Sequence, residues 1–258
     1  MRRFRVPFIL FILTLAAASA AHPDRPHIIY ILADDLGYGD VRCFNPQGKI
    51  PTPHLDQLAA EGMRFTDAHS GSSVCTPTRY GLLTGRYAWR SRLKRGVQGG
   101  MSPRLIEPGR FTVAQLLKDH GYHTACVGKW HLGMDWARKP GTPPFIDNIE
   151  AGAEGWQADY TQPITNGPNA VGFDYYFGIS ASLDMVPYTF IENDRVVALP
   201  TMEKSFTFMQ PGNDKPTRSG PGAPDFEAVD VLPTVARKAV EVITAHSAKG
   251  APQPLFLY

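Results

Sequence analysis

The residues whose types and spacing best suit chemistry lie in one run, Cys-Thr-Pro-Thr-Arg-Tyr-Gly-Leu-Leu-Thr-Gly-Arg, at positions 75–86. Cys75 supplies a thiol, and Arg79, four residues later, supplies a guanidinium that suits a flat, two-pronged contact with an anion. Taken alone, Cys75 has a simpler interpretation, because free Cys is among the most buried residue types.

Two further groups of polar residues flank this run. Asp34 and Asp35 end an apolar stretch and offer the oxygen ligands that calcium prefers, although an isolated Asp-Asp pair is more often a turn or a helix cap. Lys129 and His131 close the segment 121–131. Two positions apart in an extended segment, both can point to one side and present a cation and an imidazole to an anion. An isolated Lys-Trp-His is more often ordinary loop sequence.

The three motifs, in this order, resemble those of the type I sulfatases. The resemblance implies that a formylglycine-generating enzyme oxidises Cys75 to formylglycine, whose hydrate attacks the sulfur of a sulfate ester and later expels sulfate. It implies four catalytic residues: Cys75, Arg79, Lys129 and His131. It also implies a divalent cation, Ca²⁺ or Mg²⁺, with three ligands: Asp34, Asp35 and Cys75.

The implied parts fit one another chemically. A divalent cation lowers the pKa of an oxygen bound to it, and calcium, a weaker Lewis acid than zinc, would chiefly orient the sulfate. A helix starting near Cys75 offers amide donors to the anion. The family's further His, its Asp-Asn or Asp-Gln metal pair and its second Lys are not found in register. Two carboxylates and residue 75 are too few for a cation with six to eight ligands, so we expect weak metal binding.

Between the motifs, the hydrophobic pattern alternates between strands and helices. Apolar runs predict strands at 27–33, 63–68, 123–127 and 254–258. Helical spacing with caps predicts helices at 52–62, 77–83, 112–120 and 226–247, the last with a possible kink at Pro233. This alternation indicates an α/β fold, with a mostly parallel sheet and helices on both faces. The resemblance implies the alkaline-phosphatase-like fold, in truncated form.

The segment from Met134 to Pro224 lacks periodicity and is rich in Gly and Pro. Exceptions are an apolar stretch at 173–178 and a hairpin at 188–197 that turns at Asn193 and Asp194. We expect long surface loops around a site, with disorder as the alternative.

The amino terminus has the pattern of a secretory signal peptide. Residues 2–5 include three Arg, residues 6–17 are almost wholly apolar, and residues 18–20 give a small-x-small cleavage pattern. The apolar stretch is shorter than the roughly 20 residues that span a bilayer, so we expect no stable membrane anchor. We expect cleavage after Ala20 and a secreted or periplasmic protein whose catalytic domain is residues 21–258.

Charge and aromatic content bear on partners. Removing the first 20 residues removes three Arg and no acid, so 26 basic residues become 23 against 24 acidic ones, a formal charge of −1. We therefore expect no Lys- or Arg-rich face and no nucleic-acid partner. The expected partner is a sulfated small molecule or carbohydrate, since the segment 182–188 resembles one in arylsulfatase-like and sugar-sulfate hydrolases. Four aromatic residues could stack on a sugar, although core packing is their commoner role: Trp136, Trp156, Tyr175 and Tyr176.

Three cysteines, Cys43, Cys75 and Cys126, do not suggest a disulfide framework. Because the pattern stops at a strand ending in Tyr258, we expect an incomplete catalytic domain whose last strand is an exposed, aggregation-prone sheet edge. The main hypothesis is a sulfuric ester hydrolase. The alternatives are a phosphonate or phosphate monoester hydrolase on the same fold and a non-catalytic, truncated anion-binding remnant.

Overall fold

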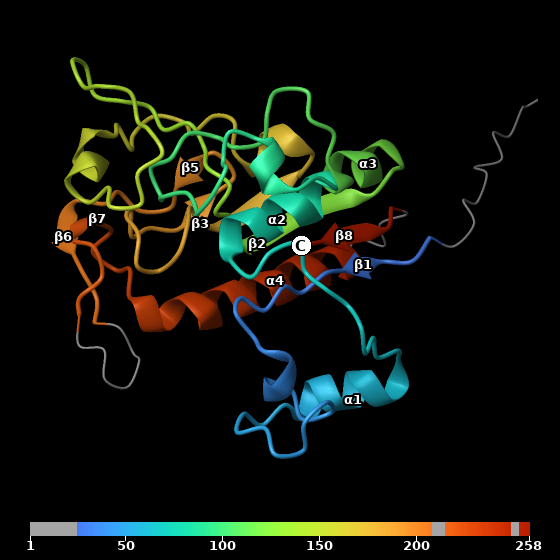
Figure 1. Cartoon of the computed structure of the whole chain (residues 1–258). Helices are drawn as coiled ribbons and strands as arrows, with labels where there is room; N and C mark the ends of the chain where they lie inside the picture. Colours follow the sequence, from blue (N-terminus) through green and yellow to red (C-terminus); the bar gives the residue numbers. More distant parts are fainter. Residues whose placement is uncertain (1–24, 208–214, 249–252) are drawn as a thin grey trace, which may run out of the picture.

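The computed structural model describes residues 25–207, 215–248 and 253–258, and its centre is a six-stranded sheet (Figure 1). The strand order is β1-β8-β2-β3-β4-β5, with bounds β1 (Ile28–Ile29), β8 (Leu255–Leu257), β2 (His123–Lys129), β3 (Tyr175–Ile179), β4 (Ile191–Glu192) and β5 (Arg195–Val196). The first four strands pair in parallel, whereas the β3–β4 and β4–β5 pairs are antiparallel. The mostly parallel sheet predicted from the alternating pattern is confirmed.

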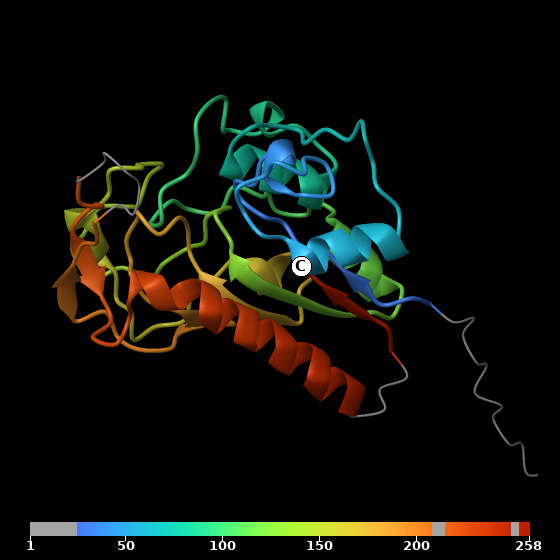
Figure 2. The same ribbon diagram turned by 90° about the horizontal axis from the view of Figure 1, so that it is seen from below.

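Three helices cover the two faces of this sheet: α2 (Cys75–Thr84), α3 (Val113–Asp119) and α4 (Val231–Ala248). A fourth helix, α1 (Pro53–Glu61), lies apart from the sheet (Figure 1). In Figure 1, α2 and α3 lie above the sheet and α4 lies below it, and in Figure 2 α4 lies along the near face of the strands. Short 3₁₀ turns connect these elements: η1 (Tyr38–Asp40), η2 (Ala88–Arg90), η3 (Ala153–Gln157), η4 (Pro168–Val171) and η5 (Ala228–Asp230).

The side-chain alternation of the strands explains the two layers. Ala125 on β2, with Leu255 and Leu257 on β8, packs against α4 residues that include Ile243. The intervening Phe256 belongs to the larger core on the opposite face, which includes α2 and α3 side chains. Because successive strand residues point to opposite faces, continuous apolar runs are what a sheet covered on both sides requires.

The predicted helices are confirmed, with shifted ends. Thr112 caps α3 by accepting a hydrogen bond from the Gln115 amide at 3.1 Å, and Gly121, at φ 83°, follows the end of that helix. α4 begins at Val231, five residues later than predicted. Pro233 therefore falls in its first turn, where the missing N–H has no intrahelical partner, and the predicted kink is not needed.

Two strand predictions are wrong. Residues 63–68 form no strand, and Met63 and Phe65 are 77% and 67% exposed there. The last strand is not an edge, because β8 pairs with β1 on one side and β2 on the other. The parallel crossover through α4 returns the chain to the middle of the sheet, as such connections allow. The edge strand at this end is the short β1.

The segment from Met134 to Pro224 is not a set of surface loops. It contains β3, the β4–β5 hairpin, which confirms the predicted turn, and a second sheet of β6 (Met202–Lys204) and β7 (Gly220–Gly222). Many of its side chains are buried in the core, among them Met134, Trp136, Tyr176 and Tyr188. Core packing is thus the role of Trp136 and Tyr176, while Trp156 and Tyr175 are half-buried.

Along the three described stretches, no helix is long and apolar enough to cross a membrane.

Candidate active site

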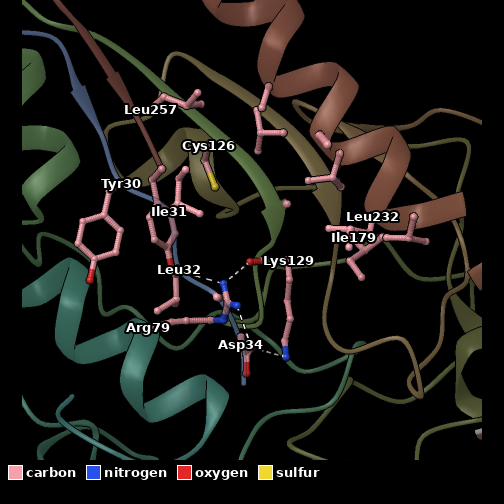
Figure 3. Close-up of a pocket in the computed structure, with 18 of the residues that line it drawn as sticks. Tyr30, Ile31, Leu32, Asp34, Arg79, Cys126, Lys129, Ile179, Leu232 and Leu257 are labelled. Atoms are coloured by element: carbon pink, nitrogen blue, oxygen red, sulfur yellow. Dashed lines mark hydrogen bonds and ion pairs between the residues drawn. The ribbon is translucent and has the colours of Figure 1, made fainter. Parts of the chain in front are cut away.

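A cavity of about 920 Å³ opens at the carboxyl ends of β1 and β2 (Figure 3). Its polar end is formed by Asp34, Asp35, Arg79 and Lys129, and its apolar walls come from the chain after β1 and from α4, including Leu232. The carboxyl edge of parallel strands is where ligands bind in open α/β sheets. The segment 182–188 takes part as well, since Ser182 and Leu183 line the cavity.

One carboxylate oxygen connects the three motifs. Asp34 Oδ2 accepts a hydrogen bond from Arg79 Nη2 at 2.9 Å and another from Lys129 Nζ at 2.7 Å. Arg79 Nη1 also donates to the Lys129 carbonyl at 2.5 Å and to the Tyr258 hydroxyl at 3.4 Å. The side chains of Arg79 and Asp34 are only 6% and 12% exposed. The sequence-predicted residues Asp34, Arg79 and Lys129 therefore meet in a largely buried cluster.

The two neighbouring carboxyl groups differ in acidity. Burial opposes the ionisation of Asp34, but hydrogen bonds from Asp35, Lys129 and Arg79 outweigh it and hold the pKa of Asp34 well below its usual range. The hydrogen bond with Asp34, followed by burial and by the charge of Asp34, raises the pKa of Asp35. Asp34 is thus the fixed negative charge of the cluster.

Lys129 and His131 do not share one face of an extended segment, as the spacing had suggested. Strand β2 ends at Lys129, and His131 adopts a left-handed backbone conformation with φ 56°. Lys129 reaches Asp34, whereas His131 Nε2 lies 2.6 Å from the carbonyl oxygen of Gln98. The prediction was wrong because it assumed that the strand continued past Lys129.

His131 is fully buried. Burial, with a smaller contribution from the Lys129 charge, lowers the pKa of His131 to about 4, so the imidazole is neutral at pH 7. A neutral imidazole that faces a carbonyl through Nε2 carries its proton there. Nδ1 is then the free lone pair, and it has no hydrogen-bond partner among the described residues.

Cys75 is the first residue of α2 and is half-buried. Val74 precedes it in an extended conformation, so the amide groups of the first turn are not used by a capping side chain. Four positions along a helix bring Cys75 and Arg79 to the same side, one turn apart. The predicted helix start near the signature is confirmed, and it connects residue 75 to the Asp34 cluster through Arg79.

The carboxylate pair suits two ligand positions of a hard cation. Asp34 and Asp35 place two carboxyl groups side by side, and the charge of Asp34 helps to raise the pKa of Asp35. A divalent cation bound to both carboxylates would oppose that rise. Within residues 25–207, 215–248 and 253–258, no three His, Cys, Asp or Glu side chains are arranged to hold a metal ion. The described residues therefore do not bring the predicted trio of Asp34, Asp35 and Cys75 together as one ligand set.

Sequence reasoning missed Gln98, which connects two motifs through its backbone. Its carbonyl contacts His131, and its amide donates to Thr76 Oγ1, beside Cys75, at 3.2 Å. Its side-chain amide donates to Asp147 at 3.0 Å. A backbone contact leaves no residue-type signal, so nothing in the sequence could have identified this position.

Fold and site together place the chain among α/β proteins of the alkaline-phosphatase-like fold. The sulfatase family pattern matches residues 26–221, which is most of the chain. The chain therefore belongs to the sulfatase family, as its three motifs predicted.

Two curated relatives illustrate the similarity. An N-acetylgalactosamine-6-O-sulfatase of Bacteroides thetaiotaomicron is 43% identical over 175 residues, which cover 68% of this chain and 30% of the relative. Human steryl-sulfatase is 36% identical over 185 residues, covering 70% of this chain and 28% of the relative. The matched region thus spans about a third of the length of these curated relatives.

Solved structures agree with the family. A sulfatase structure determined in connection with glycosaminoglycan metabolism by Bacteroides thetaiotaomicron superposes with a TM-score of 0.68 and 32% identity, covering 90% of this chain and 50% of the other. A protein solved in complex with a neocarrahexaose gives a TM-score of 0.54 and 25% identity, covering 91% and 44%.

Proposed function

We propose that this protein hydrolyses sulfate monoesters through a formylglycine made from Cys75, with Ca²⁺ or Mg²⁺ held by Asp34, Asp35 and residue 75. One observation carries the proposal. Arg79, one helical turn after Cys75, and Lys129, from the second motif, both contact the same oxygen of Asp34. The nucleophile helix and the cation motif therefore converge at the mouth of one cavity.

The chain's own residues have distinct roles in this proposal. Arg79 and Lys129 place positive charge beside the sulfate and stabilise its negative charge. The first amide groups of α2 add dipoles of the same sign. His131 holds its proton on Nε2 against Gln98 and offers Nδ1 as an acceptor to the hydrated side chain. When bound, the cation would orient the sulfate and make a hydroxyl bound to it more acidic.

We propose a sulfated carbohydrate as the substrate class. The name of the Bacteroides relative, an N-acetylgalactosamine-6-O-sulfatase, supports this choice. The choice also agrees with Ser182 and Leu183, from a segment like one in sugar-sulfate hydrolases, lining the cavity.

The first test is the mass of the peptide containing Cys75 after production with a formylglycine-generating enzyme. Conversion gives the mass of the aldehyde, and the protein should then release sulfate from sulfated N-acetylhexosamines or aryl sulfates, while Cys75→Ala should release none. A residue 75 that stays a thiol while a control substrate is converted would overturn the proposal. Faster hydrolysis of phosphonate or phosphate monoesters would favour the alternative on the same fold.

We also propose that the protein is exported. Residues 1–20, which carry the signal pattern, lie outside the described residues. Sequencing the amino terminus of protein recovered from a secreting host tests this, with Ala21 as the expected first residue. An intact Met1 on recovered protein would contradict it.

A further inference from the structure

One stretch of the chain is rich in basic residues that, apart from Arg79, take no part in the cluster around Asp34. Between Asp67 and Glu107 the sequence contains no Asp or Glu but seven Lys and Arg residues. Five of these fall within residues 86–95, which we call the 86–95 ridge. The near-neutral overall charge concealed this feature, and the expectation that no Lys- or Arg-rich face exists is wrong at this position.

The ridge is held in a fixed shape by three small buried side chains. Ala88, Ser91 and Leu93 are 4%, 4% and 7% exposed. Ser91 Oγ donates to the Ala88 carbonyl at 2.6 Å and accepts from the Leu93 amide at 3.1 Å. With the backbone anchored in this way, most of the remaining side chains of the ridge are exposed, whereas Arg86 is half-buried.

The outward side chains include two large aromatic rings. Tyr87 and Trp89 are 56% and 59% exposed, and their rings stack with an interplanar angle of 14° and a centroid separation of 5.9 Å. The two rings therefore present large apolar surfaces side by side to solvent, on which a planar or ring-shaped ligand can stack. Tyr87 also packs over Gly71, whose Cβ position lies 3.8 Å from the ring, on the loop that leads to Cys75.

Cationic side chains surround the aromatic pair. Lys94 Nζ donates to the Trp89 carbonyl at 3.0 Å, and Arg86 Nη2 donates to the Arg90 carbonyl at 3.1 Å. Arg92 forms an ion pair with Asp147 at 2.9 Å. By contrast, no carboxylate of the described part of the chain pairs with Arg90, Lys94 or Arg95, all of which are exposed.

We propose that the 86–95 ridge binds an acidic polysaccharide chain outside the catalytic cavity, with Tyr87 and Trp89 stacking on sugar rings and Arg90, Lys94 and Arg95 pairing with sulfate groups. None of these residues lines the cavity that contains Asp34 and Arg79. The ridge therefore holds the polymer while a different unit of it occupies the reacting site. The inference rests on the proposed function only in expecting the polymer to be sulfated.

Nucleic acid is the competing polyanion, because bases also stack on aromatic side chains. A dedicated nucleic-acid domain usually has a strongly basic pI, above about 9. This chain has a pI of 8.4 even with its basic leader included. A localised cationic and aromatic strip on an otherwise balanced protein matches a sulfated glycan better.

The test measures binding of labelled chondroitin sulfate to the Cys75→Ala protein, which cannot turn the polymer over. Two variants are compared: R90S/K94S/R95S on the ridge and K49S/K139S/R195S, which removes the same formal charge from exposed positions elsewhere. We expect the ridge variant to lose at least about tenfold in affinity and to have a shallower salt dependence, with the control variant within about twofold. Trp89→Ala should weaken binding by the Cys75→Ala protein, without changing hydrolysis of a small sulfate ester by protein that carries formylglycine at position 75.

Two outcomes would overturn the inference: equal losses in the two triple variants, or tighter binding of single-stranded DNA than of the sulfated polymer. Thermal melting of each variant confirms that the surface changes leave the fold intact. Failure of the proposed function is separable, because binding by the Cys75→Ala protein does not depend on sulfate hydrolysis.

Discussion

Asp34 Oδ2 lies 2.7 Å from Lys129 Nζ, and this ion pair joins the ends of two strands that are not neighbours in the sheet. Strand β8 lies between β1 and β2, so the ion pair reaches across the carboxyl end of β8. Arg79 completes the arrangement from α2. The cluster therefore fixes the loop after β1 against both the central strands and the helix that starts at Cys75.

Asp34→Asn should destabilise the protein strongly. The amide keeps the shape of the carboxyl group but leaves the largely buried Arg79 and Lys129 charges without a counter-ion. Breaking such a pair from one side costs about 3 kcal/mol or more. Urea denaturation measures the loss in the free energy of unfolding.

Glu241→Gln is the matched control, because Glu241 pairs with Lys238 at 3.1 Å on α4 and its side chain is 58% exposed. Exposed pairs contribute about 0–1 kcal/mol. If both variants lose a similarly small free energy of unfolding, solvent screens the charges of the Asp34 cluster as strongly as those of an exposed ion pair.

His131 should make stability depend on pH in mildly acidic solution. Its folded pKa, about 4, lies below the ordinary value of 6.5, so the unfolded chain binds the proton more readily. The free energy of unfolding therefore rises with pH between these two pKa values. The contribution of the neutral imidazole to stability is lost as the pH falls from about 6.5 to 4. The loss from this residue is about 3 kcal/mol at pH 4.

The measurement is denaturation of wild type and His131→Gln across this pH range. The variant should be less sensitive to acid than wild type, even where it is less stable at pH 7. His69→Gln, on an exposed loop residue, controls for the loss of a histidine. Parallel pH profiles for wild type and His131→Gln would rule out a buried neutral imidazole.

Much of the site could be predicted because its geometry follows from the order of elements. Strands that run parallel end at one edge, so Asp34 and Lys129 had to meet near the start of the helix at Cys75. The contact between His131 and Gln98 could not be predicted, since it depends on a left-handed backbone position and a carbonyl 33 residues earlier. The buried part of 134–224 was missed because irregular segments and very short strands leave no period in the sequence.

The three thiols should differ in reactivity. Cys43 and Cys75 are half-buried, whereas Cys126 is 1% exposed on β2, and burial raises its pKa to about 12. The thiolate is the reactive species, so a maleimide should label Cys43 but not Cys126 in the native protein. Peptide masses before and after denaturation report each site. Labelling of Cys126 at the rate of Cys43 would contradict the packing of β2 against its neighbours.

Two glycines should respond in opposite directions to alanine. A Cβ at Gly178 on β3 would lie 1.7 Å from the Gly128 carbonyl oxygen of the paired strand β2, so the strands must separate. We expect Gly178→Ala to cost about 3 kcal/mol or more. Gly81 lies inside α2, and a Cβ there meets nothing nearer than 3.7 Å. Gly81→Ala should therefore stabilise the protein by about 0.5–1 kcal/mol, because alanine has less backbone freedom to lose.

Thermal and urea denaturation of the two variants give the sign and size of each effect. Because Gly81 is in the same helix as Cys75 and Arg79, a stabilised Gly81→Ala would also show that α2 tolerates a stiffer backbone behind the nucleophile position. A destabilised Gly81→Ala would mean that this helix depends on a close backbone approach near Arg86. A neutral Gly178→Ala would mean that β2 and β3 can move apart at their carboxyl ends, next to Lys129.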